Sequence, residues 1–197
     1  MSNIFIHSTS LVETHQIGCG TQIWAFAQVL KGVTIGAQCN IGDHCLIETG
    51  VTIDDNVVIN HGNQVWSGVM LDNGRFVGPI QQAAPKRHPA PHVIQAQAND
   101  NNQQKPVITR IREGAIIRSG AVVLAGTQIG KFAIVGVRAV VTQDVPAYAL
   151  VVGNPARIQG WVCQCGQPLK FYRQYAQCEM CNLSYTKDQK TVKLVTF

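Results

Sequence analysis

The sequence predicts an all-β protein: a solenoid of short parallel strands with a triangular cross-section, followed by a small module held together by metal. Two observations predict it, a six-residue repeat of apolar residues and two close pairs of cysteines near the C-terminus. Charged residues make up 14% of the 197 residues, well below the roughly 25% of an average soluble domain. So low a charge, together with 46% hydrophobic residues, excludes a disordered chain and a coiled coil.

The repeat places a large apolar residue at every sixth position. Its members are Phe5, Leu11, Ile17, Ile23, Val29, Ile35, Ile41, Ile47, Ile53, Ile59, Val65, Leu71 and Val77, and then Ile111, Ile117, Val123, Ile129, Val135 and Val141. A period of six is neither helical nor simple strand alternation. It fits coils of three short strands and three corners, in which the aliphatic residue points inward and a small residue two positions earlier lets the chain turn. We expect about six or seven stacked coils.

The repeat is interrupted between Val77 and Ile111, whose separation is not a multiple of six. Residues 79–106 contain five prolines and a run rich in Gln and Asn, with Arg87 and His88 in the first part. Long loops inside a compact domain are usually functional or disordered. We therefore expect a loop that either covers a groove against a neighbouring subunit or remains solvated.

Four cysteines form a second pattern after the repeat. They are Cys163, Cys165, Cys178 and Cys181, two close pairs separated by 12 residues. This spacing is typical of a structural zinc site with tetrahedral thiolate coordination. Iron in a rubredoxin-like site is the main alternative. Two disulfides would need an oxidising compartment, and the N-terminus shows no signal peptide.

These patterns divide the chain into a solenoid, residues 1–158, and a zinc-ribbon-like module, residues 159–197. The other cysteines, Cys19, Cys39 and Cys45, lie in the repeat, where we expect them to be small buried residues.

The net charge of +5 is unevenly distributed. Residues 1–78 carry two basic and six acidic side chains, whereas residues 157–197 carry six basic and two acidic ones. No dense basic stripe is present, so nucleic-acid binding is not expected, although zinc ribbons with nearby lysines such as Lys187, Lys190 and Lys193 do bind it. No apolar run approaches the roughly 18 residues of a membrane span. We expect a cytoplasmic protein with no membrane contact.

The repeat ends in the segment 144–157, which reads DVP and then VVGNPAR. Over residues 5 to about 158, the chain resembles the hexapeptide-repeat acyltransferases, which are left-handed parallel β-helices. The resemblance implies the left hand and a coenzyme A groove beside the closing segment. It places Arg118, Arg138, Ala139, Gly153, Pro155 and Arg157 near the coenzyme. The arginines suit its phosphates, and glycine permits a close backbone approach.

Five segments, 21–29, 39–48, 62–68, 76–79 and 109–115, match one subgroup in order. They resemble the nucleotide-sugar 3-N-acetyltransferases, which acetylate a UDP- or dTDP-linked amino sugar destined for surface glycans such as lipopolysaccharide. The resemblance implies a homotrimer with sites in grooves between adjacent solenoids, and acetyl-CoA and a nucleotide-linked amino sugar as substrates.

The reaction joins a neutral amine to a thioester carbonyl, so a proton acceptor and a hydrogen-bond donor are needed. The candidate bases are His44 and Glu48, and His44 is preferred because histidine titrates close to neutral pH. His61, His88 and His92 remain open for this role. The residues expected to bind the substrate are Trp24, Asp43, His61, Gln64, Trp66, Arg87 and His88.

Several positions depart from the subgroup pattern, and in the last repeats Arg118 and Arg138 replace the small residues usually seen beside the coenzyme. His is frequent where Gln28 stands, Asp is usual where Ser67 stands, and Asn is usual where Ile80 stands. These departures favour a changed substrate or, as the alternative function, a non-catalytic trimeric scaffold or regulatory paralogue. A γ-type carbonic anhydrase is a further alternative, but only His44 and His61 have a suitable spacing, and it needs three histidines.

Overall fold

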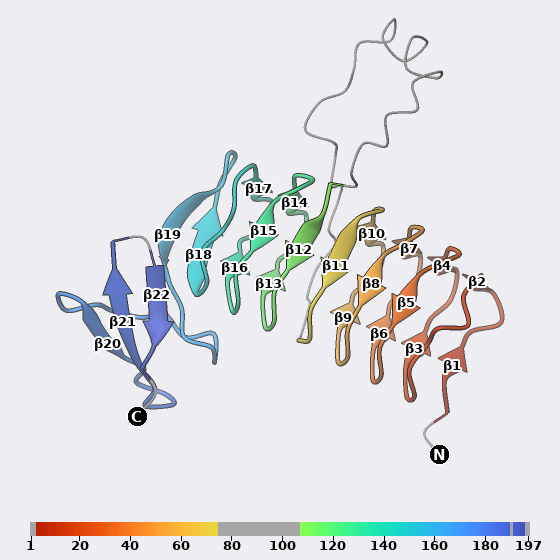
Figure 1. The fold of residues 1–197 in the computed structure, drawn as a ribbon, viewed down its shortest axis with the longest axis horizontal. Coiled ribbons are helices and arrows are strands. Elements are labelled where there is room, and N and C mark those ends of the chain that lie inside the picture. Colours follow the sequence, from red (N-terminus) through yellow and green to blue (C-terminus); the bar gives the residue numbers. More distant parts are fainter. Residues whose placement is uncertain (1–2, 75–106, 190, 196–197) are drawn as a thin grey trace, which may run out of the picture.

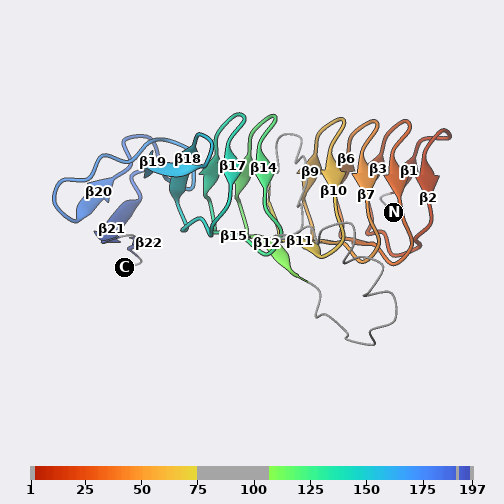
Figure 2. The same ribbon diagram turned by 90° about the horizontal axis from the view of Figure 1, so that it is seen from above.

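Strands are the only regular elements in the computed structural model, which describes residues 3–74, 107–189 and 191–195 (Figure 1). The chain winds from one end of an elongated solenoid to the other, and a three-stranded sheet follows at the C-terminal end (Figures 1 and 2). Among the described residues, no helix is long and apolar enough to cross a membrane. The predicted all-β parallel solenoid is confirmed.

Three faces make up the solenoid, and each repeats once per coil (Figure 1). The first face holds β1 (Phe5–Ile6), β3 (Gln22–Ile23), β6 (Asn40–Ile41), β9 (Val58–Ile59), β13 (Ile116–Ile117), β16 (Ile134–Val135) and β18 (Ala149–Val152). The second face holds β2 (Leu11–Val12), β4 (Gln28–Val29), β7 (Leu46–Ile47), β10 (Gln64–Val65), β14 (Val122–Val123) and β17 (Val140–Val141). The third face holds β5 (Thr34–Ile35), β8 (Thr52–Ile53), β11 (Val69–Leu71), β12 (Thr109–Ile111) and β15 (Gln128–Ile129).

The register between coils explains the six-residue repeat. Ile23 pairs with Ile41, and Ile41 pairs with Ile59, so residues 18 apart stack directly on one another. All three are at most 1% exposed, because one aliphatic residue from each strand points into the core. On the third face, Leu71 pairs with Ile111, so this face continues across the insertion without a break.

The first coil departs from the predicted phase. Ile6 pairs with Ile23 and Val12 pairs with Val29, so these residues occupy the inward register, not Phe5 and Leu11. Leu11 is 51% exposed while Val12 is half-buried, whereas Phe5 and Ile6 are both 44% exposed, so there the register alone makes the assignment. The prediction for these two positions was wrong. Only one side of the first coil is covered by another coil, so burial constrains its phase less. Val77, the last predicted member before the gap, lies outside the described residues.

Corners between faces use a left-handed residue three positions after the inward aliphatic one. Glycine fills several of these positions, for example Gly62 (φ 69°). His44 (φ 57°) and Arg138 (φ 55°) occupy the same kind of position without being glycine. This turn geometry favours glycine, which explains the glycine-rich repeat. We call the corners after the first, second and third faces the first, second and third corner.

Cysteines of the repeat divide by their place in the coil. Cys39 and Cys45 stand two positions before an inward isoleucine and are 1% exposed, as predicted. Burial raises the pKa of the Cys45 thiol to about 11. Cys19 is exposed, so the prediction that it is buried was wrong. It lies two positions after Ile17, in a corner where side chains face outward.

The C-terminal module continues directly from the solenoid. β18 pairs antiparallel with β19 (Arg157–Trp161), which spans the predicted boundary at residue 158. The module's own sheet contains β20 (Tyr175–Gln177), β21 (Ser184–Asp188) and β22 (Thr191–Leu194). One hydrophobic cluster extends from the solenoid into the module. The division into two domains stays a prediction.

Candidate functional site

The first corner gathers predicted site residues from separate coils. Trp24, the Asp43–His44 pair and His61 lie there in three successive coils, and Arg118 and Arg138 lie there beyond the insertion. All of these side chains are exposed except that of Asp43, which is half-buried. The corner therefore carries a carboxylate and imidazoles toward its N-terminal end and guanidinium groups toward its C-terminal end.

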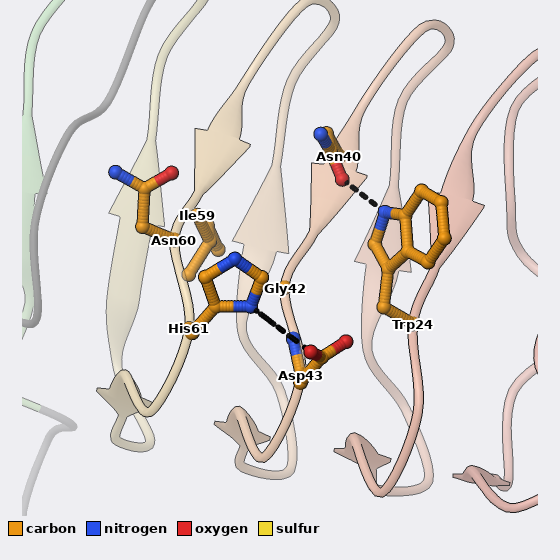
Figure 3. Close-up of a pocket in the computed structure, with 7 residues that line it drawn as sticks. All are labelled: Trp24, Asn40, Gly42, Asp43, Ile59, Asn60 and His61. Atoms are coloured by element: carbon orange, nitrogen blue, oxygen red, sulfur yellow. Dashed lines mark hydrogen bonds and ion pairs between the residues drawn. The ribbon is translucent and has the colours of Figure 1, made fainter.

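A groove of about 340 Å³ lies between the first three of these coils (Figure 3). Its lining residues are Trp24, Asn40, Gly42, Asp43, Ile59, Asn60 and His61. The Trp24 indole Nε1–H donates to Asn40 Oδ1 at 2.7 Å, and the Phe5 ring packs against the indole with 5.3 Å between centroids. These contacts fix the Trp24 ring at one end of the groove.

His61 is held by the coil before it. The backbone N–H of Asp43 donates to His61 Nδ1 at 3.0 Å, and Asp43 Oδ2 lies 3.3 Å from the same nitrogen. An amide N–H only donates, so Nδ1 of the neutral ring is the acceptor and Nε2 carries the hydrogen. Figure 3 shows the Nε2 side of the ring turned away from Asp43. His61 thus presents a hydrogen-bond donor to the groove.

Gly42 makes this contact possible. A Cβ on Gly42 would lie 2.6 Å from the backbone nitrogen of His61, which is closer than real Cβ contacts come. Glycine therefore lets the two coils approach closely at the position where Asp43 and His61 meet.

His44 lies at the same corner with its ring unengaged by hydrogen bonds. The ring packs against Phe26 from the preceding coil, with centroids 4.9 Å apart. The backbone N–H of His44 donates to the Ala25 carbonyl at 3.0 Å, which fixes the corner. Within the described part of the chain, no group forms a hydrogen bond with the imidazole nitrogens of His44. Both nitrogens are therefore open to a hydrogen bond with a ligand.

Glu48 lies on the second corner, at the other end of β7 from His44. Its Oε2 accepts a hydrogen bond from the Ser67 backbone N–H at 3.0 Å and another from the Ser67 hydroxyl at 2.9 Å. The structure does not bring the two predicted bases to one corner. Ser67, a departure from the family pattern, is here the partner of Glu48.

Gln64 and Trp66 also lie away from the groove. Gln64 is half-buried on the second face, and Trp66 follows it at the second corner. The indole Nε1–H of Trp66 is buried and has no hydrogen-bond partner among the described residues. Arg87 and His88, together with Ile80 and the loop 79–106, lie outside the described residues.

The predicted coenzyme residues lie in the C-terminal coils. The Ala139 side chain is fully buried in the solenoid, so any contact it makes with a ligand is confined to its backbone. Gly153 has a φ of 96° and is exposed with Pro155 in the turn before β19. Arg157 is exposed, and its guanidinium donates to the Ala156 carbonyl at 3.0 Å.

Asn40 and Asn60 are groove residues that sequence reasoning missed. Asn60 lies one coil beyond Gly42, and Asn40 lies in the strand that leads into the groove. The 18-residue register, applied to the positions beside Asp43, is the pattern that identifies Asn60.

The four cysteines converge in the C-terminal module. Their sulfur atoms all lie within 4.8 Å of one another, with Cys163 and Cys181 3.3 Å apart and Cys165 and Cys178 3.5 Å apart. A disulfide needs about 2.05 Å. Thiolates around one zinc ion at about 2.3 Å would lie about 3.8 Å apart, so the cluster fits such an ion. Among the described residues, this is the only group of His, Cys, Asp or Glu close enough to hold a metal, and it contains no histidine.

Backbone amides favour the thiolate form in part of this cluster. Hydrogen bonds from the Cys181 and Met180 backbone N–H groups lower the pKa of the Cys178 thiol to about 6. Burial raises the pKa of the Cys163 thiol to about 12. A bound cation would be needed to hold all four sulfurs as thiolates near neutral pH.

Residues 14–49 match the family model for the bacterial transferase hexapeptide, six repeats. A dTDP-3-amino-3,6-dideoxy-alpha-D-galactopyranose 3-N-acetyltransferase from Aneurinibacillus thermoaerophilus is 41% identical over 175 residues, which cover 89% of this chain and 87% of that protein. A serine acetyltransferase from Haemophilus influenzae is 30% identical over 110 residues, 56% of this chain and 32% of that enzyme.

Among solved structures, WeeI from Acinetobacter baumannii AYE is similar with a TM-score of 0.50 at 22% identity. The match covers 77% of this chain and 55% of WeeI. At this identity the similarity supports the solenoid fold, and the relatives with higher identity carry the family assignment.

Proposed function

This chain belongs to the hexapeptide-repeat transferase family, together with the amino-sugar 3-N-acetyltransferase that it matches over most of its length, and from that premise we propose that it transfers an acetyl group from acetyl-CoA to the amino group of a nucleotide-linked amino sugar. A dTDP-linked 3-amino-3,6-dideoxyhexose is the first acceptor to test, because the matched relative's name specifies it. We also propose that the product serves surface glycans such as lipopolysaccharide.

The observation that carries the proposal is the arrangement of two histidines on one corner. His44 has unengaged ring nitrogens, whereas the Nδ1 of His61 accepts a hydrogen bond from the Asp43 backbone N–H. An acyl transfer to an amine needs one group that takes a proton and another that donates a hydrogen bond. The corner supplies both within adjacent coils.

We assign the proton-accepting role to His44 and a substrate-orienting role to His61. A ring nitrogen of His44 would take the proton that the amine loses as it attacks. His61 Nε2–H would donate to an oxygen of the substrate, with Trp24 and Asn40 lining the sugar side of the groove. Acetyl-CoA would supply the activated thioester carbonyl. Glu48 is less suited as the base, because two donors from Ser67 already occupy Oε2.

Arg118, Arg138 and Arg157 would bind the phosphates of the coenzyme, with Gly153 and Pro155 shaping the turn beside them. Arg118 and Arg138 lie on the same corner as the histidines, and all three arginines are exposed. Guanidinium groups form bidentate, charge-assisted hydrogen bonds with phosphate. Neutralising Arg118 and Arg138 would therefore weaken coenzyme binding more than acceptor binding.

We also propose that the enzyme works as a cytoplasmic homotrimer. Trp24 and Phe26 are 38% and 54% exposed on the first corner, beside the groove. A neighbouring solenoid packed against that corner would bury these rings and supply the second wall of the groove. The four cysteines would hold a structural Zn²⁺, since the sulfur donors match its preference and leave no open coordination position.

A thiol-release assay with acetyl-CoA and a panel of dTDP- and UDP-linked amino sugars tests the function. We expect turnover with at least one 3-amino sugar nucleotide and its loss in His44→Ala. His15→Ala is the matched control, because His15 is exposed and follows β2, so it lies on the second corner and not on the first. No turnover with any acceptor, combined with no coenzyme A binding by calorimetry, would support the non-catalytic scaffold instead.

A further inference from the structure

Tyr185 is the most completely buried large side chain of the C-terminal module. It lies on β21 and is 0% exposed. Its hydroxyl oxygen accepts a hydrogen bond from the Gln164 backbone N–H at 3.1 Å and lies 3.0 Å from Cys163 Sγ. A tyrosine hydroxyl has one hydrogen to donate, and a metal-bound thiolate has none. With a metal present, the hydroxyl therefore donates to the Cys163 sulfur.

Of the two buried cysteines in the cluster, Cys163 receives fewer hydrogen bonds from backbone N–H groups. The only backbone N–H close to its sulfur among the described residues is that of Cys165, at 3.5 Å. Cys178, by contrast, receives hydrogen bonds from two backbone N–H groups, those of Met180 and Cys181. The Tyr185 hydroxyl is thus the closer of the two donors that hold the Cys163 sulfur in place.

The Tyr185 ring connects this ligand to the solenoid. It packs edge-on against Tyr148, with centroids 5.3 Å apart and an interplanar angle of 69°. Tyr148 stacks on Phe132 from the preceding coil, with centroids 5.6 Å apart at 15°. The Tyr148 backbone N–H donates to the Lys131 carbonyl, and its carbonyl accepts from the Val162 N–H, both at 2.8 Å.

Tyr148 therefore belongs to both parts of the molecule. It lies in the closing segment that leads to Gly153 and Arg157, and one residue further on in the chain β18 begins. Contacts run without interruption from the Cys163 sulfur through Tyr185 and Tyr148 to Phe132. Phe132 lies two residues before β16, and Arg138 follows the same strand.

We propose that Tyr185 is the hydrogen-bond donor that positions Cys163 as a metal ligand, and that its contact with Tyr148 couples metal occupancy to the stability of the last coils of the solenoid. This inference rests on the metal site proposed above. Donors to ligating groups commonly contribute about 10–100-fold in metal affinity. Because the last coil has no further coil beyond it, the module and its metal take the place of the missing neighbour.

The test uses the full-length reduced protein with Co²⁺ as a probe and Zn²⁺ as competitor. Tyr185→Phe keeps the ring but removes the donor, and Tyr175→Phe is the matched control, since Tyr175 is 67% exposed in the same sheet. We expect Tyr185→Phe to bind Zn²⁺ about 10–100-fold more weakly and to shift the thiolate-to-cobalt absorption to lower energy. A thiolate that loses a hydrogen bond is the better electron donor, which is why the band shifts. Tyr175→Phe should match the wild type.

A second variant tests the coupling. Tyr148→Leu leaves the four cysteines and Tyr185 in place, so it should bind Co²⁺ with the wild-type spectrum while the rise in Tm on adding Zn²⁺ becomes smaller. Unchanged affinity and spectrum in Tyr185→Phe would overturn the positioning role, and an unchanged Tm rise in Tyr148→Leu would overturn the coupling. If the wild-type protein binds neither ion, the metal site itself is refuted, whatever the acetyltransferase assay shows.

Discussion

The backbone N–H of Asp43 donates to Nδ1 of His61, one coil of 18 residues further along the chain. Asp43 thus engages Nδ1 of His61 with its backbone N–H and, at 3.3 Å, with Oδ2, whereas the ring nitrogens of His44 have no such partner among the described residues. The two histidines lie on one corner, and they differ in that Nδ1 of His61 is engaged by Asp43 while both ring nitrogens of His44 are open to a ligand.

Replacing His44 removes the proton acceptor. We expect His44→Ala to lower kcat by about 10²–10⁴-fold, the usual contribution of general base catalysis, with little change in the KM for acetyl-CoA. Steady-state kinetics with the preferred acceptor measure both. A loss confined to KM would assign His44 to binding and leave the base elsewhere.

His61 should tolerate a substitution that keeps a hydrogen-bond donor. We expect His61→Gln to retain most of kcat/KM, and His61→Ala to lose about 10–100-fold, because a hydrogen bond to a charged or reacting group is worth about 1.5–3 kcal/mol. The comparison needs both variants at one pH. Equal inactivity of the two would mean that His61 acts as a base and not as a donor.

Arg118 and Arg138 are expected to act on the coenzyme side. Each change to Ala should raise the KM for acetyl-CoA about 10–100-fold, since a charge-assisted hydrogen bond contributes about 1.5–3 kcal/mol, and the effect should shrink at high ionic strength. The KM for the amino sugar should stay constant. Arg173→Ala, an exposed arginine of the C-terminal module, is the control. A larger effect on acceptor KM would contradict the assignment.

The loss of stability on truncating an apolar side chain should follow the observed register and not the predicted one. Ile23 is 0% exposed and Leu11 is 51% exposed, although both belong to the same six-residue series. We expect Ile23→Ala to lower the free energy of unfolding by about 2–5 kcal/mol. Leu11→Ala should cost less than about 1 kcal/mol. Chemical denaturation of both variants measures the difference, and similar losses would contradict the register of the first coil.

The thiols of the repeat should react in two classes. Burial raises the pKa of Cys45 to about 11, so its thiolate is scarce at neutral pH, whereas Cys19 is exposed. We expect alkylation at pH 8 to modify Cys19 rapidly and Cys45 only after unfolding. Peptide mass spectrometry after timed labelling reports each site. Equal labelling rates in the native protein would show that the Cys45 position opens readily.

Much of the fold was predictable because each six-residue unit repeats the same short pattern of inward apolar residues and corner residues. A six-residue period permits only a narrow set of backbone paths, so the parallel solenoid and an interruption between Val77 and Ile111 follow from counting residues. The closeness of the four cysteines was predictable for a similar reason, since two pairs on short turns can meet around one ion. Phe5 and Leu11 failed because the first coil lacks a neighbour that would enforce the phase.

The sequence predicted which residues form the site but not what each of them does. Sequence alone placed Trp24, Asp43, His44 and His61 among the candidates, and the 18-residue coil brings them to one corner. It paired His44 with Glu48 as bases, yet they lie at opposite ends of β7, and Ser67 occupies the carboxylate. Which nitrogen of His61 is free depends on an amide one coil away, and such contacts have no local pattern.

The sequence by itself thus determined the solenoid, its interruption and the family, because periodic burial and motif spacing depend only on the order of residues along the chain. Only the tertiary structure decided how coils meet: that Gly42 lets Asp43 reach His61, and that Tyr185 joins Cys163 to Tyr148. Hydrogen bonds and ring contacts form only when residues far apart in the sequence are positioned to within a few tenths of an ångström. Stacking one coil on another sets those distances.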